Sequence, residues 1–142
     1  MKESKFFDTN ILCYAYSTAE PKKRGVCKSL VERVFNREFK GVVSNQVLGE
    51  FFSASTSKLL MPVEDVKTVV KYLIASDKWQ KVNYTYRTIE NAISLSEQHK
   101  MPFWNTLIAQ TMIENGITEI FTENEKDFGG IPGIKVTNPF VR

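Results

Sequence analysis

The sequence has few of the residues on which most protein metal and redox chemistry depends. It contains one histidine, His99, and two cysteines, Cys13 and Cys27, among 142 residues. A single histidine excludes a multi-histidine zinc site and disfavours acid–base chemistry that relies on histidine. The cysteines lack the spacing of a metal site, so we expect both to be packing residues. Hydrolytic chemistry in this chain must therefore rest on carboxylates, hydroxyl groups and, where one is bound, a metal ion.

Long apolar runs and targeting segments are also missing. No run approaches the ~20 residues that a membrane-spanning helix needs. The first five residues lead into a strand-like stretch without the apolar core and cleavage site of a signal peptide. There is no repeat, no low-complexity segment and no linker, and 142 residues is an ordinary size for one domain. We therefore expect a single cytoplasmic domain covering residues 1–142, with no membrane partner.

The charge balance is mildly basic. The net charge is +3 and a quarter of the residues are charged. This balance is compatible with a nucleic-acid partner, although many basic proteins bind no nucleic acid.

Strand-like and helix-like patterns alternate along the chain. Strands are predicted at residues 5–7, 41–44, 79–82, 119–122 and 134–137, and a loop is predicted from Asp8. Helices are predicted at about 22–39, 45–57, 63–76, 85–99 and 104–115, with Pro21 and Pro62 at two starts and Gly116 at one end. Strands that alternate with helices predict a parallel sheet covered on both faces. Ligands of such sheets bind at the carboxyl ends of the strands, so Asp8, Ser44 and Thr122 should lie close together.

Taken singly, the candidate site residues have ordinary structural explanations. Asp8 fits a turn in which it hydrogen-bonds Asn10, and Glu50 fits the surface edge of a helix. Asn105 stands in the first turn of a helix, where asparagine is a favoured cap, and Asn124 lies in a polar loop. No single residue therefore identifies a site.

Five segments together resemble the PIN-domain family, and most of all its VapC-type toxin branch. They are residues 6–12 (FFDTNIL), 42–51 (VVSNQVLGEF), 101–109 (MPFWNTLIA), 121–124 (FTEN) and 133–140 (GIKVTNPF). The resemblance implies a three-layer α/β/α sandwich with a central, mostly parallel sheet. It also implies an endoribonuclease that hydrolyses RNA phosphodiester bonds with Mg²⁺ or Mn²⁺, usually as a homodimer inhibited by a small antitoxin protein.

The same resemblance assigns the acidic pocket residue by residue. The four metal-holding positions of the family correspond here to Asp8, Glu50, Asn105 and Asn124, and Thr122 matches the hydroxyl residue beside them. Two of the four expected carboxylates are therefore asparagines, which can ligate through an amide oxygen but carry no charge. We expect one weakly held ion, because Mg²⁺ can bind through one or two carboxylates and several waters.

Acidic residues near Asn124 and basic residues elsewhere leave alternatives open. Asp127, with Glu123 and Glu125, can compensate for a missing carboxylate or simply be solvated. Lys22, Lys23 and Arg24 near the start of one helix and Lys58 at the end of another can bind RNA phosphates or face solvent. A catalytically weakened PIN domain that binds RNA or protein is the alternative function. A phosphate-binding regulatory module is a weaker one, because no glycine-rich phosphate loop is present.

Aromatic residues near the predicted site fall into two groups. The apolar spacing of Phe103 and Trp104 predicts that both pack in the core. Tyr14 and Tyr16 are predicted to be more exposed and to be candidates for stacking on bases.

Overall fold

The computed structural model describes residues 3–141, in which strands and helices alternate as predicted. The strands are β1 (Ser4–Phe7), β2 (Lys40–Ser44), β3 (Trp79–Val82), β4 (Glu119–Phe121) and β5 (Lys135–Thr137). The helices are α1 (Thr9–Tyr16), α2 (Pro21–Phe35), α3 (Asn45–Ser57), α4 (Val63–Ala75), α5 (Tyr86–His99), α6 (Phe103–Glu114) and α7 (Glu125–Phe128).

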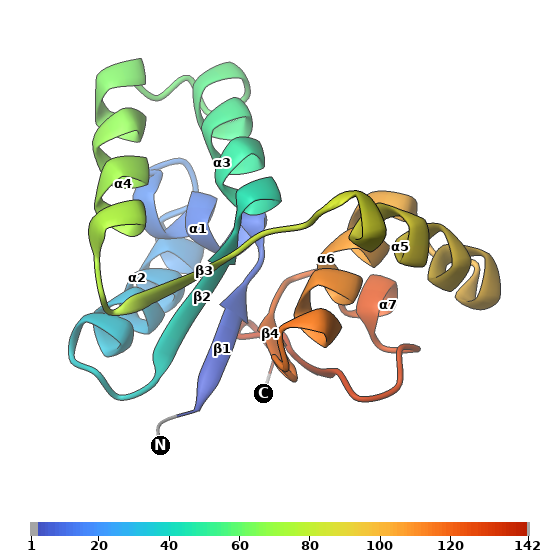
Figure 1. The fold of residues 1–142 in the computed structure, drawn as a ribbon. Helices are drawn as coiled ribbons and strands as arrows, with labels where there is room; N and C mark the ends of the chain where they lie inside the picture. Colours follow the sequence, from blue (N-terminus) through green and yellow to red (C-terminus); the bar gives the residue numbers. More distant parts are fainter. Residues whose placement is uncertain (1–2, 142) are drawn as a thin grey trace.

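The five strands form one sheet in the order β3-β2-β1-β4-β5, and every neighbouring pair is parallel. Helices α1 to α4 lie on one side of this sheet and α5 to α7 on the other (Figure 1). This division follows from topology, since right-handed crossovers that move in opposite directions from β1 place their helices on opposite faces. The predicted three-layer α/β/α sandwich with a parallel sheet is confirmed.

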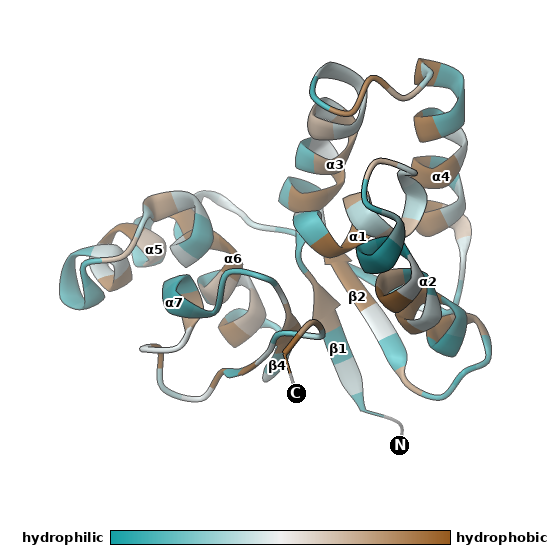
Figure 2. Ribbon diagram, turned by 180° about the vertical axis from the view of Figure 1, so that it is seen from behind, coloured by the Kyte–Doolittle hydropathy of each residue, from teal (hydrophilic) through white to brown (hydrophobic). Residues whose placement is uncertain are grey.

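The central strands β1 and β2 are apolar and buried toward their carboxyl ends, where both faces of the sheet are covered. Phe6, Phe7 and Val42 are completely buried, and β1 and β2 carry apolar colour between the two helix layers in Figure 2. The Phe7 ring meets Trp79 edge to face, with ring centroids 4.9 Å apart. Cys13 and Cys27 are free and buried in the core, as expected of packing residues.

Trp79, at the start of β3, packs directly over the backbone of Gly41 in β2. A Cβ atom added at Gly41 would lie 2.5 Å from Trp79 Cε3. Only a residue without a side chain allows the indole to approach the neighbouring strand so closely. The position of a core aromatic thus depends on one glycine.

The sequence prediction is wrong directly after Asp8, where helix α1 replaces the expected loop. Asp8 has extended backbone angles and its side chain accepts a hydrogen bond from Thr9 N, which makes it the N-cap of α1. The helix is only 8 residues long, and Ile11, Leu12 and Ala15 are buried against the core. Tertiary packing stabilises this helix, because segments shorter than about 12 residues are marginal on their own.

Two further boundaries differ from the prediction. Helix α2 ends at Phe35 and not at residue 39, because Arg37 has a φ of 61° and turns the chain toward β2. Phe39 is then buried immediately before β2. The polar segment after Thr122, predicted as a loop, contains the single-turn helix α7. Among residues 3–141, none of the helices has the length and apolar character that crossing a membrane requires.

Candidate functional site

The candidate site lies where β1 and β4 end side by side. Asp8 follows β1 and Thr122 follows β4, and the N–H of Asp8 donates to the carbonyl of Phe121 across 3.1 Å. Because adjacent parallel strands end at one edge of the sheet, the residues that follow them meet there. The predicted proximity of Asp8 and Thr122 is therefore observed as a direct contact.

Asp8 is 4% exposed and each of its carboxylate oxygens is hydrogen-bonded. Oδ1 accepts from Thr9 N at 2.7 Å, and Oδ2 accepts from Thr122 Oγ1 at 2.7 Å. Asn10 Nδ2 also donates to Oδ2, at 3.4 Å. The turn contact to Asn10 expected from sequence is present, but it accompanies a fixed carboxylate and does not replace it.

Glu50 on α3 faces the same pocket. Its Oε1 accepts from Thr9 Oγ1 at 2.7 Å and its Oε2 accepts from Gln46 Nε2 at 3.1 Å. Thr9 thus contacts both carboxylates, one through its backbone N–H and one through its hydroxyl. The pair is oriented by donors that leave further lone pairs on each carboxylate available to a ligand.

The pKa of Asp8 is raised above the ordinary carboxyl value by burial, and nearby negative charges on Glu50 and Asp127 raise it further. The hydrogen bonds from Thr122 and Thr9 oppose this shift by stabilising the ionised form. A buried carboxylate with acidic neighbours is a site at which a bound cation relieves electrostatic cost.

Asn105, in the first turn of α6, contacts Asp127, the acid for which the sequence left open whether it serves the site or is solvated. Its Nδ2 donates to Asp127 Oδ2 at 2.9 Å, so its amide oxygen has no part in that bond. Asp127 on α7 is half-buried and electrostatically coupled to Asp8. Asn124 lies at the start of the same segment, and its N–H donates to Thr122 Oγ1 at 3.0 Å.

These side chains surround a cavity of about 430 Å³. Asp8, Glu50, Asn105 and Asn124 all line it, and Lys58 lines it as well. Thr122 is completely buried and acts on the cavity through Asp8. The structure thus brings together all four positions inferred from the resemblance, with the hydroxyl residue beside them.

The donor set of this cavity suits a hard divalent cation. Carboxylate oxygens of Asp8 and Glu50 and amide oxygens of Asn105 and Asn124 are the ligand types that Mg²⁺ and Mn²⁺ accept. Within the described part of the chain, no three acidic, cysteine or histidine side chains already stand close enough to form a metal cluster. An ion at this site would therefore need amide oxygens and water in addition to the two carboxylates.

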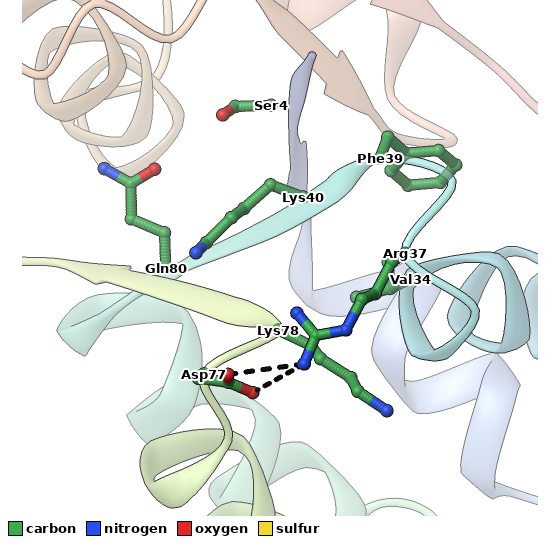
Figure 3. Close-up of a pocket in the computed structure, with 8 residues that line it drawn as sticks. All are labelled: Ser4, Val34, Arg37, Phe39, Lys40, Asp77, Lys78 and Gln80. Carbon is green, nitrogen blue, oxygen red and sulfur yellow. Dashed lines mark hydrogen bonds and ion pairs between the residues drawn. The ribbon is translucent and has the colours of Figure 1, made fainter. Parts of the chain in front are cut away.

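A larger cavity, about 510 Å³, lies at the opposite, amino-terminal end of the strands (Figure 3). Its charged side chains are mainly basic, and its acid, Asp77, is paired with Arg37 at 3.3 Å. Size alone does not mark a site. The smaller cavity at the carboxyl ends contains the acidic and amide groups that metal-dependent chemistry requires.

Sequence reasoning missed or misjudged several residues around the site. Gln46, predicted only as part of a helix, orients Glu50 through a hydrogen bond. Their spacing of four residues could have predicted this contact, because residues four apart on a helix are neighbours. Trp104 was predicted to pack in the core but is 60% exposed. Phe103 is half-buried. The apolar spacing of α6 continues into its first turn, so the pattern could not show that Phe103 and Trp104 lie outside the core.

The predicted exposure of Tyr14 and Tyr16 is also wrong, since both are half-buried. Tyr16 packs edge to face on Phe51, and burial raises its pKa to about 12. The Tyr14 hydroxyl donates to Glu123 Oε1 at 2.8 Å, and Lys23 binds the other oxygen of Glu123 at 2.6 Å. Tyr14, Lys23 and Glu123 thus tie α1 and α2 to the segment after β4.

Comparisons with known proteins agree with this geometry. A family model described as the PIN domain matches residues 5–133. A toxin–antitoxin complex from Klebsiella pneumoniae is 21% identical with a TM-score of 0.69, and the alignment covers 95% of this chain and 97% of that chain. VapC20 from Mycobacterium tuberculosis, described as a toxin that cleaves the sarcin–ricin loop, is 15% identical with a TM-score of 0.70, covering 92% and 98%.

A third structure extends the same likeness. VapBC2 from Rickettsia felis, bound to a DNA fragment from its promoter, is 20% identical with a TM-score of 0.65, and the alignment covers 95% of this chain and 98% of that chain. At these identities the likeness establishes a shared fold. The search of curated proteins found no significant match.

Proposed function

This chain belongs to the PIN-domain family, and we propose that it is a metal-dependent endoribonuclease of the toxin–antitoxin type. The observation that carries the proposal is the pair of carboxylates, Asp8 and Glu50, fixed in one cavity and linked by Thr9. A purely structural role does not require two acids held together at the carboxyl end of a sheet. A pocket that binds a cation together with a phosphate does require them.

Asp8 and Glu50 would hold one Mg²⁺ or Mn²⁺ ion, and the amide oxygens of Asn105 and Asn124 would complete its protein ligands. When bound, the ion stabilises negative charge on the phosphate and lowers the pKa of an attacking water. The short hydrogen bond from Thr122 stabilises the ionised form of Asp8 and so opposes the rise in its pKa that burial causes. Asp127 adds negative charge to the pocket and restores part of what the two asparagines lack.

RNA is the proposed substrate. VapC20, whose fold is shared, is described as cleaving the sarcin–ricin loop, which is an RNA target. Lys58 lines the pocket beside the two carboxylates and offers a positive group for a substrate phosphate. Among the other basic candidates, Lys22 is exposed, whereas Lys23 is paired with Glu123.

A small antitoxin and a second copy of the chain are the proposed protein partners. The similar structure from Klebsiella pneumoniae is a toxin–antitoxin complex, and the one from Rickettsia felis is VapBC2 bound to promoter DNA. By this proposal the antitoxin suppresses the nuclease, and the active form is a homodimer.

A weakened PIN domain that binds without cutting is the second candidate, favoured by the asparagines at 105 and 124. These residues remove two formal charges, and Asn105 is engaged with Asp127. The two candidates share a fold and a pocket. They differ in whether the parent protein cuts RNA.

Cleavage of small structured RNAs in Mg²⁺ or Mn²⁺ tests the proposal. We expect cleavage by the parent and its loss in Asp8→Ala. The matched control is Asp77→Asn, which removes an exposed carboxylate at the opposite end of the sheet and should retain cleavage. An inactive parent, combined with strong cleavage by the Asn105→Asp, Asn124→Asp double variant, overturns the proposal in favour of a silenced site.

A further inference from the structure

A second hollow adjoins the acidic cavity on the side of α3 and α6. This hollow, which we call the base pocket, has a volume of about 400 Å³ and is lined by Asn45, Gln46, Gly49, Glu50, Tyr84 and Trp104. Glu50 lines both cavities, so the two share this side chain as a common wall. Gly49 has no neighbour within 4 Å of its Cβ position, which leaves this part of the wall open.

Trp104 is the most exposed large aromatic group of the base pocket. Its side chain is 60% exposed, although Leu107 and Ile108 of the same helix are buried. Phe103 contacts the indole edge to face, with ring centroids 5.1 Å apart, and so restricts it without covering it. A large exposed aromatic beside an acidic cavity is a surface on which another flat group can stack.

The polar groups of the base pocket are partly unpaired. Asn45 Oδ1 accepts from the backbone N–H of both Gln46 and Tyr84, at 3.0 Å each. These two bonds join the start of α3 to the segment after β3. No described residue accepts from Asn45 Nδ2, so this amide group remains available as a donor in an exposed side chain.

In Gln46, by contrast, the acceptor oxygen is the atom that lacks a partner. Its Nε2 donates to Glu50 Oε2 and to the carbonyl of Trp104, while its Oε1 is buried without a hydrogen-bond partner. The residue is 8% exposed, and a buried acceptor without a hydrogen-bond partner is destabilising. Oε1 is enclosed in the free protein, so a donor reaches it only when the rim of the pocket, which includes Trp104, opens.

We propose that the base pocket binds one unpaired nucleobase of the RNA, next to the phosphate that an ion held by Asp8 and Glu50 would contact. The base stacks on Trp104, and its polar edge pairs with Asn45 Nδ2 as donor and Gln46 Oε1 as acceptor. Single-stranded RNA is read in this manner, by stacking on aromatic groups and hydrogen bonds to base edges. The inference rests on the proposed nuclease function, because it places the base relative to the phosphate at that site.

The composition of the pocket favours a base over a protein surface. A protein-docking patch is apolar at its centre, whereas here Asn45, Gln46 and Glu50 lie beside the two aromatics. A nucleobase satisfies both kinds of group at once, since it has an apolar face and an edge of donors and acceptors.

Tryptophan fluorescence provides a direct test, because Trp79 and Trp104 are the two tryptophans of the sequence and Trp79 is 1% exposed. Binding is measured in the Asp8→Asn background with a chelator, so that RNA is not cut. We expect a short single-stranded oligoribonucleotide to quench the emission, and the same backbone made of abasic residues to quench it little. The Trp79→Phe control should retain the quench.

Variants of the pocket give an independent measurement by fluorescence anisotropy of labelled RNA. Trp104→Ala should weaken binding roughly tenfold, about 1.4 kcal/mol, which lies within the usual contribution of one stacked base. Trp104→Phe should keep most of the affinity. Asn45→Ala, at an exposed position, should weaken binding of some bases more than others. In the cleaving protein, Trp104→Ala should raise KM more than it lowers kcat.

Three results overturn the inference. They are equal quenching by intact and abasic oligomers, unchanged RNA affinity in both Trp104→Ala and Asn45→Ala, and a change of sedimentation coefficient in Trp104→Ala without any change in RNA binding. The last result would assign the pocket to a protein interface. Base-dependent quenching in a protein that never cuts RNA would instead overturn the nuclease proposal and leave the base pocket standing as a binding site.

Discussion

Asn105 Nδ2 donates a hydrogen bond to Asp127 Oδ2 across 2.9 Å and thereby joins the first turn of α6 to α7. An aspartate at position 105 would place a second carboxylate at this distance from Asp127, and each would raise the pKa of the other. The neutral amide allows Asp127 to approach the pocket without that repulsion. A negative charge absent from α6 is thus present on α7, where it acts on Asp8.

Removing the charge of Asp127 should weaken the proposed ion site. We expect Asp127→Asn to raise the Mn²⁺ concentration needed for half-maximal RNA cleavage roughly tenfold. The substitution removes an electrostatic attraction to the ion of about 1 kcal/mol or more. Titration of the metal at fixed RNA measures this shift. Glu125→Gln, an exposed acid on the same short helix, is the control and should shift the titration little. Identical curves for both variants would exclude a role for Asp127.

Asp8 should make the metal-free protein less stable as pH rises. Its pKa is higher in the folded protein than the ordinary value of 3.8, mainly because of burial. The folded state therefore holds the proton more tightly, and stability is lost as pH rises from about 3.8 through the raised pKa. Asp8→Asn removes this dependence, so with a chelator at neutral pH we expect it to melt about 3–6 °C above the parent.

Thermal melts by circular dichroism across this pH range measure the effect. Addition of Mg²⁺ should raise the melting temperature of the parent and not that of Asp8→Asn, since the ion binds the folded state through this carboxylate. If the melting temperature of the parent followed the same pH curve as that of Asp8→Asn, the carboxyl group at position 8 would not have the raised pKa inferred from its burial.

The architecture was predictable because its signals are local. Alternating strand and helix patterns predicted the parallel sheet, and the sheet in turn predicted the edge at which Asp8 and Thr122 meet. Helix α1 was not predictable in this way, because its eight residues are stabilised by contacts with α2 and α3 and by the Asp8 cap. A short segment carries too few turns for periodicity to separate it from a loop.

The pocket residues were placed by family resemblance, and their partners were not. Gln46 and Asp127 act through contacts that span separate elements, namely α3 with α6 and α6 with α7. Pairing across 58 or 22 positions of sequence leaves no pattern in a single chain. Exposure of Trp104 was missed for a related reason, because an apolar residue at a helix start looks the same whether it meets the core or solvent.

The Thr122 hydroxyl should matter for both stability and activity. Thr122→Val removes the donor to Asp8 Oδ2 and the acceptor for Asn124 N. A hydrogen bond to a charged group contributes about 1.5–3 kcal/mol, so we expect a loss of that order in urea unfolding above the pKa of Asp8. Loss of the donor also raises the pKa of Asp8 further, so the acid limb of the cleavage–pH profile should move to higher pH.

Thr122→Ser keeps the hydroxyl and serves as the matched variant. It should retain the pH profile of the parent while losing the stability of one buried methyl group, about 1 kcal/mol. A serine variant whose profile shifts as far as that of valine would show that packing, and not the hydrogen bond, controls Asp8.

The contact between Gly41 and Trp79 predicts a large effect from a small substitution. A Cβ atom at position 41 would lie 2.5 Å from Trp79 Cε3 and 2.6 Å from Cζ3, so Gly41→Ala must displace a ring that is 1% exposed. We expect a loss of about 1–3 kcal/mol in the free energy of unfolding measured with urea, as overpacked cores show.

Gly25→Ala is the matched control, because nothing lies within 4 Å of its Cβ position in α2. There the substitution should stabilise the protein by about 0.5–1 kcal/mol, since alanine loses less backbone entropy in a helix. Opposite signs for the two variants, with the tryptophan emission unchanged in Gly25→Ala and altered in Gly41→Ala, would confirm that the close approach of the indole requires glycine. Equal and small changes would show that β2 and β3 yield to the added methyl group.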